Sequence, residues 1–172
     1  MDAAVISRQA SIRFAAVLLT SLSLLGEDAK TKPVAVEQPL PFSHKQHVTL
    51  GLNCSDCHRS PDPGEKMTLP PTSKCMDCHA TIAKDKLAIQ KLAEFAKSRE
   101  AVPWIQLYKV PDWVWFSHRT HLEAGARCDD CHGPVAQRDA LWKEVNLNMD
   151  TCMNCHRKNN ATLDCNACHE AH

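Results

Sequence analysis

Aromatic residues, glycine and net charge are all scarce in this sequence. Aromatic side chains make up 5% of its 172 residues, with a single tyrosine, and glycine occurs five times. The mean hydropathy is −0.35. Large apolar side chains normally fill the core of a domain of this length. Because so little of this material is present, we expect something other than side chains to supply much of the buried surface.

The lack of net charge and of a long apolar run excludes two classes of protein. Basic and acidic residues number 20 each, and this zero net charge excludes an electrostatic nucleic-acid binder. The longest apolar run, residues 14–26, is shorter than the roughly 20 residues of a membrane-spanning helix. Arg8 and Arg13 precede it, so residues 1–29 are predicted to be an export signal. An uncleaved N-terminal anchor is the alternative, because no A-x-A cleavage site follows. Both readings place the protein in the periplasm or on the outer face of the cytoplasmic membrane.

Cysteine and histidine, by contrast, are abundant, with ten of each. The cysteines form five pairs, and a histidine follows every pair in CSDCH (54–58), CMDCH (75–79), CDDCH (128–132), CMNCH (152–156) and CNACH (165–169). C-x-x-C-H is the attachment signature of c-type haem, in which both thiols bond to the haem and the histidine ligates the iron. Zinc sites and redox disulfides also use C-x-x-C, but neither needs a histidine after every pair.

The sequence therefore predicts five covalently bound haem c groups. The predicted attachment residues are Cys54, Cys57, Cys75, Cys78, Cys128, Cys131, Cys152, Cys155, Cys165 and Cys168. The predicted proximal iron ligands are His58, His79, His132, His156 and His169.

A second pattern precedes two of these motifs. FSHKQHVTLGLNCSDCH (42–58) and FSHRTHLEAGARCDDCH (116–132) are identical at nine positions when the copies are aligned with an offset of 74. The serine of each copy can cap a helical turn, which makes the two histidines of H-x-x-H neighbours about 5–6 Å apart at Cβ. Each histidine can then reach a different iron. The predicted distal ligands are His44, His47, His118 and His121.

The repeat predicts two tandem haem modules. Residues 30–100 form the first, with two haems and a linker helix over residues 81–99 that Thr81 is expected to cap. Residues 101–172 form the second, with three haems. Residues 102–116 hold three of the four tryptophans, which are expected to cover haem faces and close the module interface.

FxHxxH followed by CxxCH motifs resembles the class III multihaem cytochromes c. VPWIQLYKVPDWVWFSHRTH, with CDDCHGPV and NMDTCMNCHRKNN, is similar to the pentahaem subunit of alternative complex III and of related menaquinol-oxidising complexes. The resemblance implies a haem-cored fold of short helices and irregular coil with little β structure. It also implies the iron-ligand pairs His44–His58, His47–His79, His118–His132 and His121–His156.

The haem of the fifth motif has two candidates for its remaining iron ligand. His172 completes a count of ten histidines for ten axial positions, but it lies only three residues beyond His169. So short a tether does not readily pass around the haem edge. The resemblance implies a ligand just before an earlier CxxCH, where this chain has Met149, and a thioether ligand would raise the potential of this haem. Chain geometry favours Met149, and His172 is the alternative.

These features predict an electron carrier. Closely spaced irons with two protein ligands each have no open position for a substrate, but they form a path for electrons. We expect an exported, periplasmic cytochrome that relays electrons from a quinol-oxidising membrane complex to a downstream acceptor. It would reach the membrane through that partner or through an uncleaved N-terminus. A free-standing soluble or extracellular shuttle is the alternative. An oxyanion reductase is disfavoured, because it needs an open iron and no CxxCK variant is present.

Overall fold

The computed structural model describes residues 34–169, which belong to a single compact unit, residues 33–172. The predicted export signal, residues 1–29, and the candidate ligand His172 therefore lie outside the described residues.

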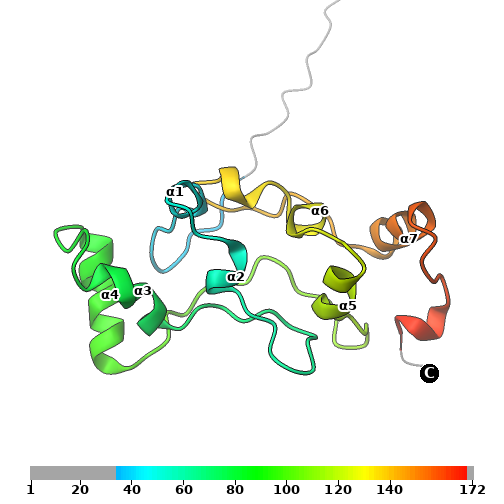
Figure 1. Cartoon of the computed structure of the whole chain (residues 1–172), viewed down its shortest axis with the longest axis horizontal. Helices are drawn as coiled ribbons and strands as arrows, with labels where there is room; N and C mark the ends of the chain where they lie inside the picture. Colours follow the sequence, from blue (N-terminus) through cyan, green and yellow to red (C-terminus); the bar gives the residue numbers. More distant parts are fainter. Residues whose placement is uncertain (1–33, 170–172) are drawn as a thin grey trace, which may run out of the picture. The chain divides into compact units, whose positions relative to one another are not determined.

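Short helices joined by long irregular segments make up the described chain (Figure 1). In chain order they are α1 (His44–Thr49), α2 (Cys54–Cys57), α3 (Thr72–His79), α4 (Leu87–Ser98), α5 (His118–Glu123), α6 (Cys128–His132), the 3-10 helix η1 (Val135–Gln137), α7 (Met149–Lys158) and the 3-10 helix η2 (Cys165–Ala167). Within residues 34–169, β structure is limited to an isolated antiparallel bridge between Val114 and His169. This confirms the expected fold of short helices and coil with little β structure.

The linker helix is shorter than the sequence predicted. It begins at Leu87, not near Thr81, and ends at Ser98. Thr81 instead belongs to the turn that closes α3, where its backbone N–H and its hydroxyl both donate to the carbonyl of Cys78. Arg99 then ends α4 in the left-handed conformation, with φ of 61°. The hydrophobic pattern of residues 81–99 was correct for α4, but the turn that closes α3 uses Thr81, and the helix starts only at Leu87.

The apolar core of the described chain is very small. It consists of Leu40, Leu92 and Val102, with Phe95 and Trp104 among the partly buried side chains around it. This cluster lies where α3 and α4 pack together. Many larger apolar side chains are exposed in the polypeptide, and an exposed apolar surface marks a place where another molecule binds. Side chains alone therefore do not supply a normal core, as the composition predicted.

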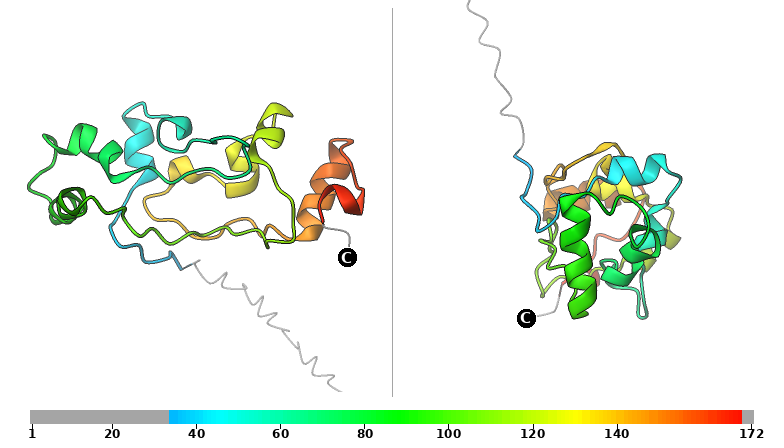
Figure 2. Two further views of the ribbon diagram at one scale, coloured as in Figure 1. Left: turned by 90° about the horizontal axis from the view of Figure 1, so that it is seen from below. Right: turned by 90° about the vertical axis from the view of Figure 1, so that its left-hand side faces the viewer.

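Segments that are distant in the sequence lie side by side in this unit. The N-terminal α1 packs on η1 from the second half of the chain. Figure 2 shows α3 and α4 at one end of the unit and α7 with η2 at the other. Within residues 34–169, no helix has both the length and the apolar character needed to cross a membrane.

Candidate haem attachment and ligand sites

We number the attachment sites 1 to 5 in chain order, after the motifs that begin at Cys54, Cys75, Cys128, Cys152 and Cys165. Sites 1, 2, 3 and 4 lie on α2, α3, α6 and α7, whereas site 5 lies on η2.

The two H-x-x-H segments form the short helices α1 and α5, as their sequence predicted. The Ser43 hydroxyl caps α1 by accepting the N–H of Gln46 at 3.0 Å, and the Ser117 hydroxyl caps α5 by accepting the N–H of Thr120 at 3.3 Å. The first histidine of each pair is the first helical residue, and the second follows three positions later. The serine cap therefore decides where both distal histidines start on the helix.

A phenylalanine contacts both histidine rings of each pair. Phe42 stacks on His47 with ring centroids 4.4 Å apart and meets His44 edge-on at 4.8 Å. Phe116 repeats both contacts in the second copy, at 4.6 Å and 4.8 Å. Sequence reasoning assigned no role to these phenylalanines, although their identity in both copies was the available signal. Each one fixes the orientation of two candidate iron ligands.

Four histidine pairs face each other across a gap that fits one metal ion. A metal–imidazole bond is about 2.0 Å and the ring centroid lies about 1.1 Å behind the nitrogen, so two axial imidazoles have centroids about 6.2 Å apart. The observed separations are 6.4 Å, 6.2 Å, 6.4 Å and 6.1 Å, for His44–His58, His47–His79, His118–His132 and His121–His156 respectively. These are the four pairs that the resemblance implied, and the described residues fit bis-histidine haem at sites 1 to 4.

Hydrogen bonds at Nδ1 leave Nε2 of most of these rings available for a metal. The bonded carbonyls lie 2.6 to 3.2 Å away, in the pairs His47–Ser43, His58–Thr68, His79–Ile82, His118–Glu65, His121–Ser117 and His156–Thr162. A carbonyl only accepts, so each Nδ1 is the protonated nitrogen. Metal-binding histidines typically donate the N–H of one ring nitrogen in this way while the other nitrogen binds the metal.

Two family models and a relative match this chain. The class III cytochrome c family model matches residues 24–102, and the model of cytochrome c7 and related cytochrome c matches residues 114–170. The multihaem cytochrome c subunit of menaquinone reductase from Nitratidesulfovibrio vulgaris is 32% identical over 161 residues, which cover 79% of this chain and 77% of that protein.

This chain belongs to the class III-type multihaem cytochromes c. The family confirms covalently bound haem c as the cofactor. It also confirms that the cytochrome is an electron-transfer protein and not a catalytic enzyme, because the family's chemistry is that of its haem irons.

The angle between paired imidazole planes divides the cytochrome's sites into two classes. The planes are nearly parallel at sites 1 and 3, with angles of 9° and 2°. They are strongly inclined at sites 2 and 4, with angles of 65° and 44°. The first histidine of each H-x-x-H belongs to a parallel pair and the second to an inclined pair, so the duplication reproduces this division of ring angles as well as the ligands.

Burial favours the neutral form of the ligand rings. Burial, together with the smaller effects of the neighbouring rings of His58 and His47, lowers the pKa of His44 to about 4. The pKa of His132 is lowered by burial and then by His118 and His58. Only a neutral imidazole has a lone pair for a metal, so these environments favour ligation at neutral pH.

An aspartate inside two of the motifs caps its own attachment helix. The Asp56 carboxylate accepts the backbone N–H of Asn53 at 2.7 Å, at the start of α2. The Asp130 carboxylate accepts that of Arg127 at 2.8 Å, at the start of α6, and this hydrogen bond lowers the pKa of Asp130. Sequence reasoning assigned no role to this repeated aspartate. It stabilises the turn that presents the two cysteines.

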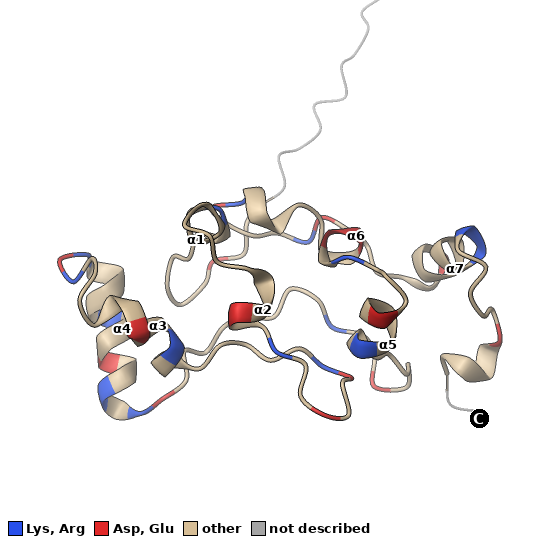
Figure 3. Ribbon diagram, in the orientation of Figure 1, with Lys and Arg blue, Asp and Glu red and all other residues tan. Residues whose placement is uncertain are grey.

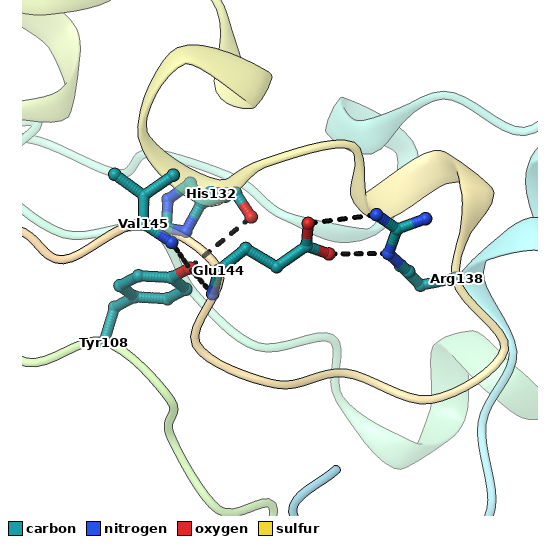
Figure 4. A network of polar contacts seen from close by, with 5 residues as sticks. All are labelled: Tyr108, His132, Arg138, Glu144 and Val145. Atoms are coloured by element: carbon teal, nitrogen blue, oxygen red, sulfur yellow. Dashed lines mark hydrogen bonds and ion pairs between the residues drawn. The ribbon is translucent and has the colours of Figure 1, made fainter. Parts of the chain in front are cut away.

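Tyr108 holds the proximal histidine of site 3 against another part of the chain (Figure 4). Its ring meets His132 edge-on with centroids 4.8 Å apart. The Tyr108 hydroxyl accepts the backbone N–H groups of Glu144 at 3.1 Å and Val145 at 3.3 Å. Glu144 in turn forms two hydrogen bonds with Arg138, at 2.6 Å and 3.0 Å. The only tyrosine of the sequence is thus a support for site 3.

Site 5 has a different environment from the other four. The ring of His169 stacks on Trp113 with centroids 5.2 Å apart. The His169 Nδ1 is buried without a protein partner among the described residues. Met149 is the first residue of α7 and its side chain is 61% exposed, while His172 lies outside the described residues. The choice between Met149 and His172 as distal ligand stays a prediction.

Proposed function

We propose that this cytochrome carries five haems and relays electrons as a subunit of a membrane complex that exchanges electrons with menaquinone. The similarity to a menaquinone reductase cytochrome subunit over most of both chains supports such a partner. Five CxxCH motifs support the haem count. We place the protein in the periplasm or on the outer face of the cytoplasmic membrane, since covalent attachment to CxxCH and the predicted signal both fit export.

The observation that carries this proposal is the proximity of attachment cysteines from different motifs. In the first half, burial raises the pKa of the Cys75 thiol at site 2, and the nearby Cys57 thiol of site 1 raises it further. Between the halves, burial raises the pKa of Cys128 at site 3, and the nearby Cys54 thiol of site 1 raises it further. Site 1 therefore lies between sites 2 and 3.

The same relation links the remaining sites. Burial raises the pKa of Cys131 at site 3, as does the nearby Cys155 thiol of site 4. Burial and then the Cys168 thiol of site 5 raise the pKa of Cys152 at site 4. These neighbouring thiols indicate the spatial order 2–1–3–4–5, and Figure 1 shows the helices of sites 2, 1, 3 and 4 (α3, α2, α6 and α7) in the same order along the unit. Bound haem supplies one-electron transfer at its iron, and this arrangement of attachment points supports a continuous path with sites 2 and 5 at its ends.

The direction of electron flow is set by the partners. The relative's name describes reduction of menaquinone, whereas the resemblance seen in the sequence implied oxidation of menaquinol. The same row of sites serves both directions, because each one-electron step is reversible and the potentials decide its sign. In the described chain, lysine and arginine are interspersed with aspartate and glutamate (Figure 3). Haem propionates would add negative charge, and we propose that a basic partner surface docks there.

Purification of the tagged chain from its native membranes tests the function. We expect it to co-purify with integral membrane subunits, and we expect the isolated complex to pass electrons between the cytochrome haems and a menaquinone analogue. A chain recovered alone from the soluble fraction, with no quinone-linked activity in the membranes, would favour the free-standing shuttle. Intact mass should exceed that of the polypeptide by five haems, and a count of four or fewer would contradict the equivalence of all five motifs.

A further inference from the structure

The two halves of the chain contact each other twice, through equivalent residues. The backbone N–H of Arg119 donates to the carbonyl of Gly64 at 3.0 Å, and that of Lys45 donates to the carbonyl of Arg138 at 3.0 Å. Lys45 and Arg119 occupy the same position of the repeat, and Gly64 and Arg138 are likewise 74 positions apart. One contact is therefore made in both directions, which is the pattern of a two-fold symmetric interface.

Residues near a two-fold axis meet their own equivalents, and this occurs at sites 1 and 3. The thiols of Cys54 and Cys128, which are equivalent positions, are close enough for Cys54 to contribute to the raised pKa of Cys128, after burial. His58 and His132, also equivalent, are close enough for His58 to contribute to the lowered pKa of His132, after burial and His118. Sites 1 and 3 thus face each other across a pseudo-two-fold axis inside one chain.

The symmetry fails at one contact, and this contact involves a candidate iron ligand. In the second half, the His118 Nδ1 donates to the backbone carbonyl of Glu65, a residue of the first half, at 2.8 Å. The equivalent of Glu65 is Asp139, which instead accepts the Ser43 hydroxyl through its side chain at 2.7 Å. The His44 Nδ1 is buried without a protein partner among the described residues.

The hydrogen bond of His118 depends on a close approach of the loop backbone to α5, and this approach requires glycine at position 64. Gly64 has a φ of +94°, and a Cβ atom added there would lie 2.6 Å from the Arg119 Cβ and 2.7 Å from its Nε. The Arg119 guanidinium pairs with Asp62 of the same loop at 2.5 Å, and the Ser117 hydroxyl donates to the Gly64 carbonyl at 3.4 Å. The loop therefore packs directly on the first turn of α5.

We propose that the loop formed by residues 59–68 is a positioning element for His118, and that its contact with His118 lowers the reduction potential of the haem at site 3. This rests on the proposed ligation of iron by His118. A carbonyl that accepts the ligand's N–H makes the imidazole more basic and stabilises the ferric iron, which lowers the reduction potential. We therefore expect the site 3 potential to rise when this contact is lost. Site 1 has a carbonyl contact of its own, because the Nδ1 of its proximal His58 donates to the carbonyl of Thr68 at 3.0 Å.

Gly64→Ala tests the proposal, with Gly51→Ala as the matched control. Gly51 has a φ of +93°, so alanine costs the same backbone strain there, but its Cβ would meet nothing within 4 Å. We expect Gly64→Ala to shift one haem midpoint potential upward and to change its low-spin electron paramagnetic resonance (EPR) signal. That signal should be the one that His118→Ala removes. Gly51→Ala should leave it unchanged.

Arg119→Ala is the second variant. It tests the effect of the loop on site 3 if Gly64→Ala does not yield a cytochrome with its haems attached. It keeps the fold of α5 but removes the side chain that anchors the loop, and we expect a smaller upward shift of the same signal. Lys45→Ala, at the equivalent position, should not move it. The proposal is overturned if neither variant shifts the site 3 signal, or if the controls shift it equally. These potentials are measured on the purified cytochrome. The proposed function is tested separately, by the haem count and by co-purification, so failure of one proposal can be told from failure of the other.

Discussion

Removing one histidine at a time from α5 should disable two different haems of different electronic classes. His118 faces His132 at site 3 with planes 2° apart, while His121 faces His156 at site 4 with planes 44° apart. The two side chains are only three residues apart on one short helix. If both are iron ligands, His118→Ala and His121→Ala should give clearly different spectra despite this proximity.

The expected size of each effect follows from the ring geometry. Parallel imidazole planes act on the same iron d orbital and separate the two π-type d orbitals, whereas inclined planes leave them closer in energy. Sites 1 and 3 therefore form a more rhombic EPR class and sites 2 and 4 a more axial class. Each variant should remove one of two members, and so about half the intensity, of one class. The opened iron should also bind carbon monoxide, at about one molecule per chain.

Low-temperature EPR of the oxidised protein, together with carbon monoxide titration of the reduced protein, measures these outcomes. His118→Ala should halve the rhombic class and His121→Ala the more axial class. Thr120→Ala is the control, because it changes α5 between the two histidines and should leave both classes intact. Loss of rhombic intensity in His121→Ala, or no new carbon monoxide site in either variant, would refute the ligand pairs.

Three further predictions concern the small core, the site 3 support and site 5. Leu92→Ala should lower the unfolding free energy of the loaded protein by about 2–5 kcal/mol in chemical denaturation, while Leu87→Ala, at an 81% exposed position, should change it by less than about 0.5 kcal/mol. Tyr108→Phe leaves two backbone N–H groups without their acceptor and should cost about 1–3 kcal/mol in the same assay, and an unchanged midpoint would contradict the role of its hydroxyl. Met149→Ala should abolish a sulfur-to-iron absorption band in the near infrared, whereas deletion of His172 should not; the reverse outcome would assign the fifth distal ligand to His172.

The chemistry of this protein could be predicted from its sequence because that chemistry depends on short-range patterns. A CxxCH motif places two thiols and a histidine within one turn, whatever surrounds it. The spacing of FxHxxH likewise presents two rings on one helical face once Ser43 or Ser117 caps the turn. The family comparisons confirm the class III relationship, the haem c cofactor and electron transfer. The haem count, the ligand pairs, the division into two modules and the export of the protein stay predictions.

The sequence was less informative about where a helix starts and about which aromatic rings contact each other. The linker helix was predicted to begin at Thr81, but the turn that closes α3 uses that residue and α4 begins at Leu87. The roles of Phe42 and Tyr108 depend on which rings they contact, and only the folded chain brings those rings together. The role of Tyr108 reflects a tertiary contact with His132, whereas the start of α4 reflects the local turn between Thr81 and Cys78.

The sequence by itself determined that haem c is bound and which residue types bind it, since short motifs such as CxxCH and FxHxxH specify both. Tertiary structure alone decided the spatial order 2–1–3–4–5, which differs from the order in the chain because Cys54 of site 1 lies against Cys128 of site 3. It also decided which of the two equivalent histidines donates a hydrogen bond to a carbonyl of the opposite half. His44 and His118 have the same local sequence, but only His118 meets the carbonyl of Glu65 from the opposite half, because Gly64 lets that backbone approach α5.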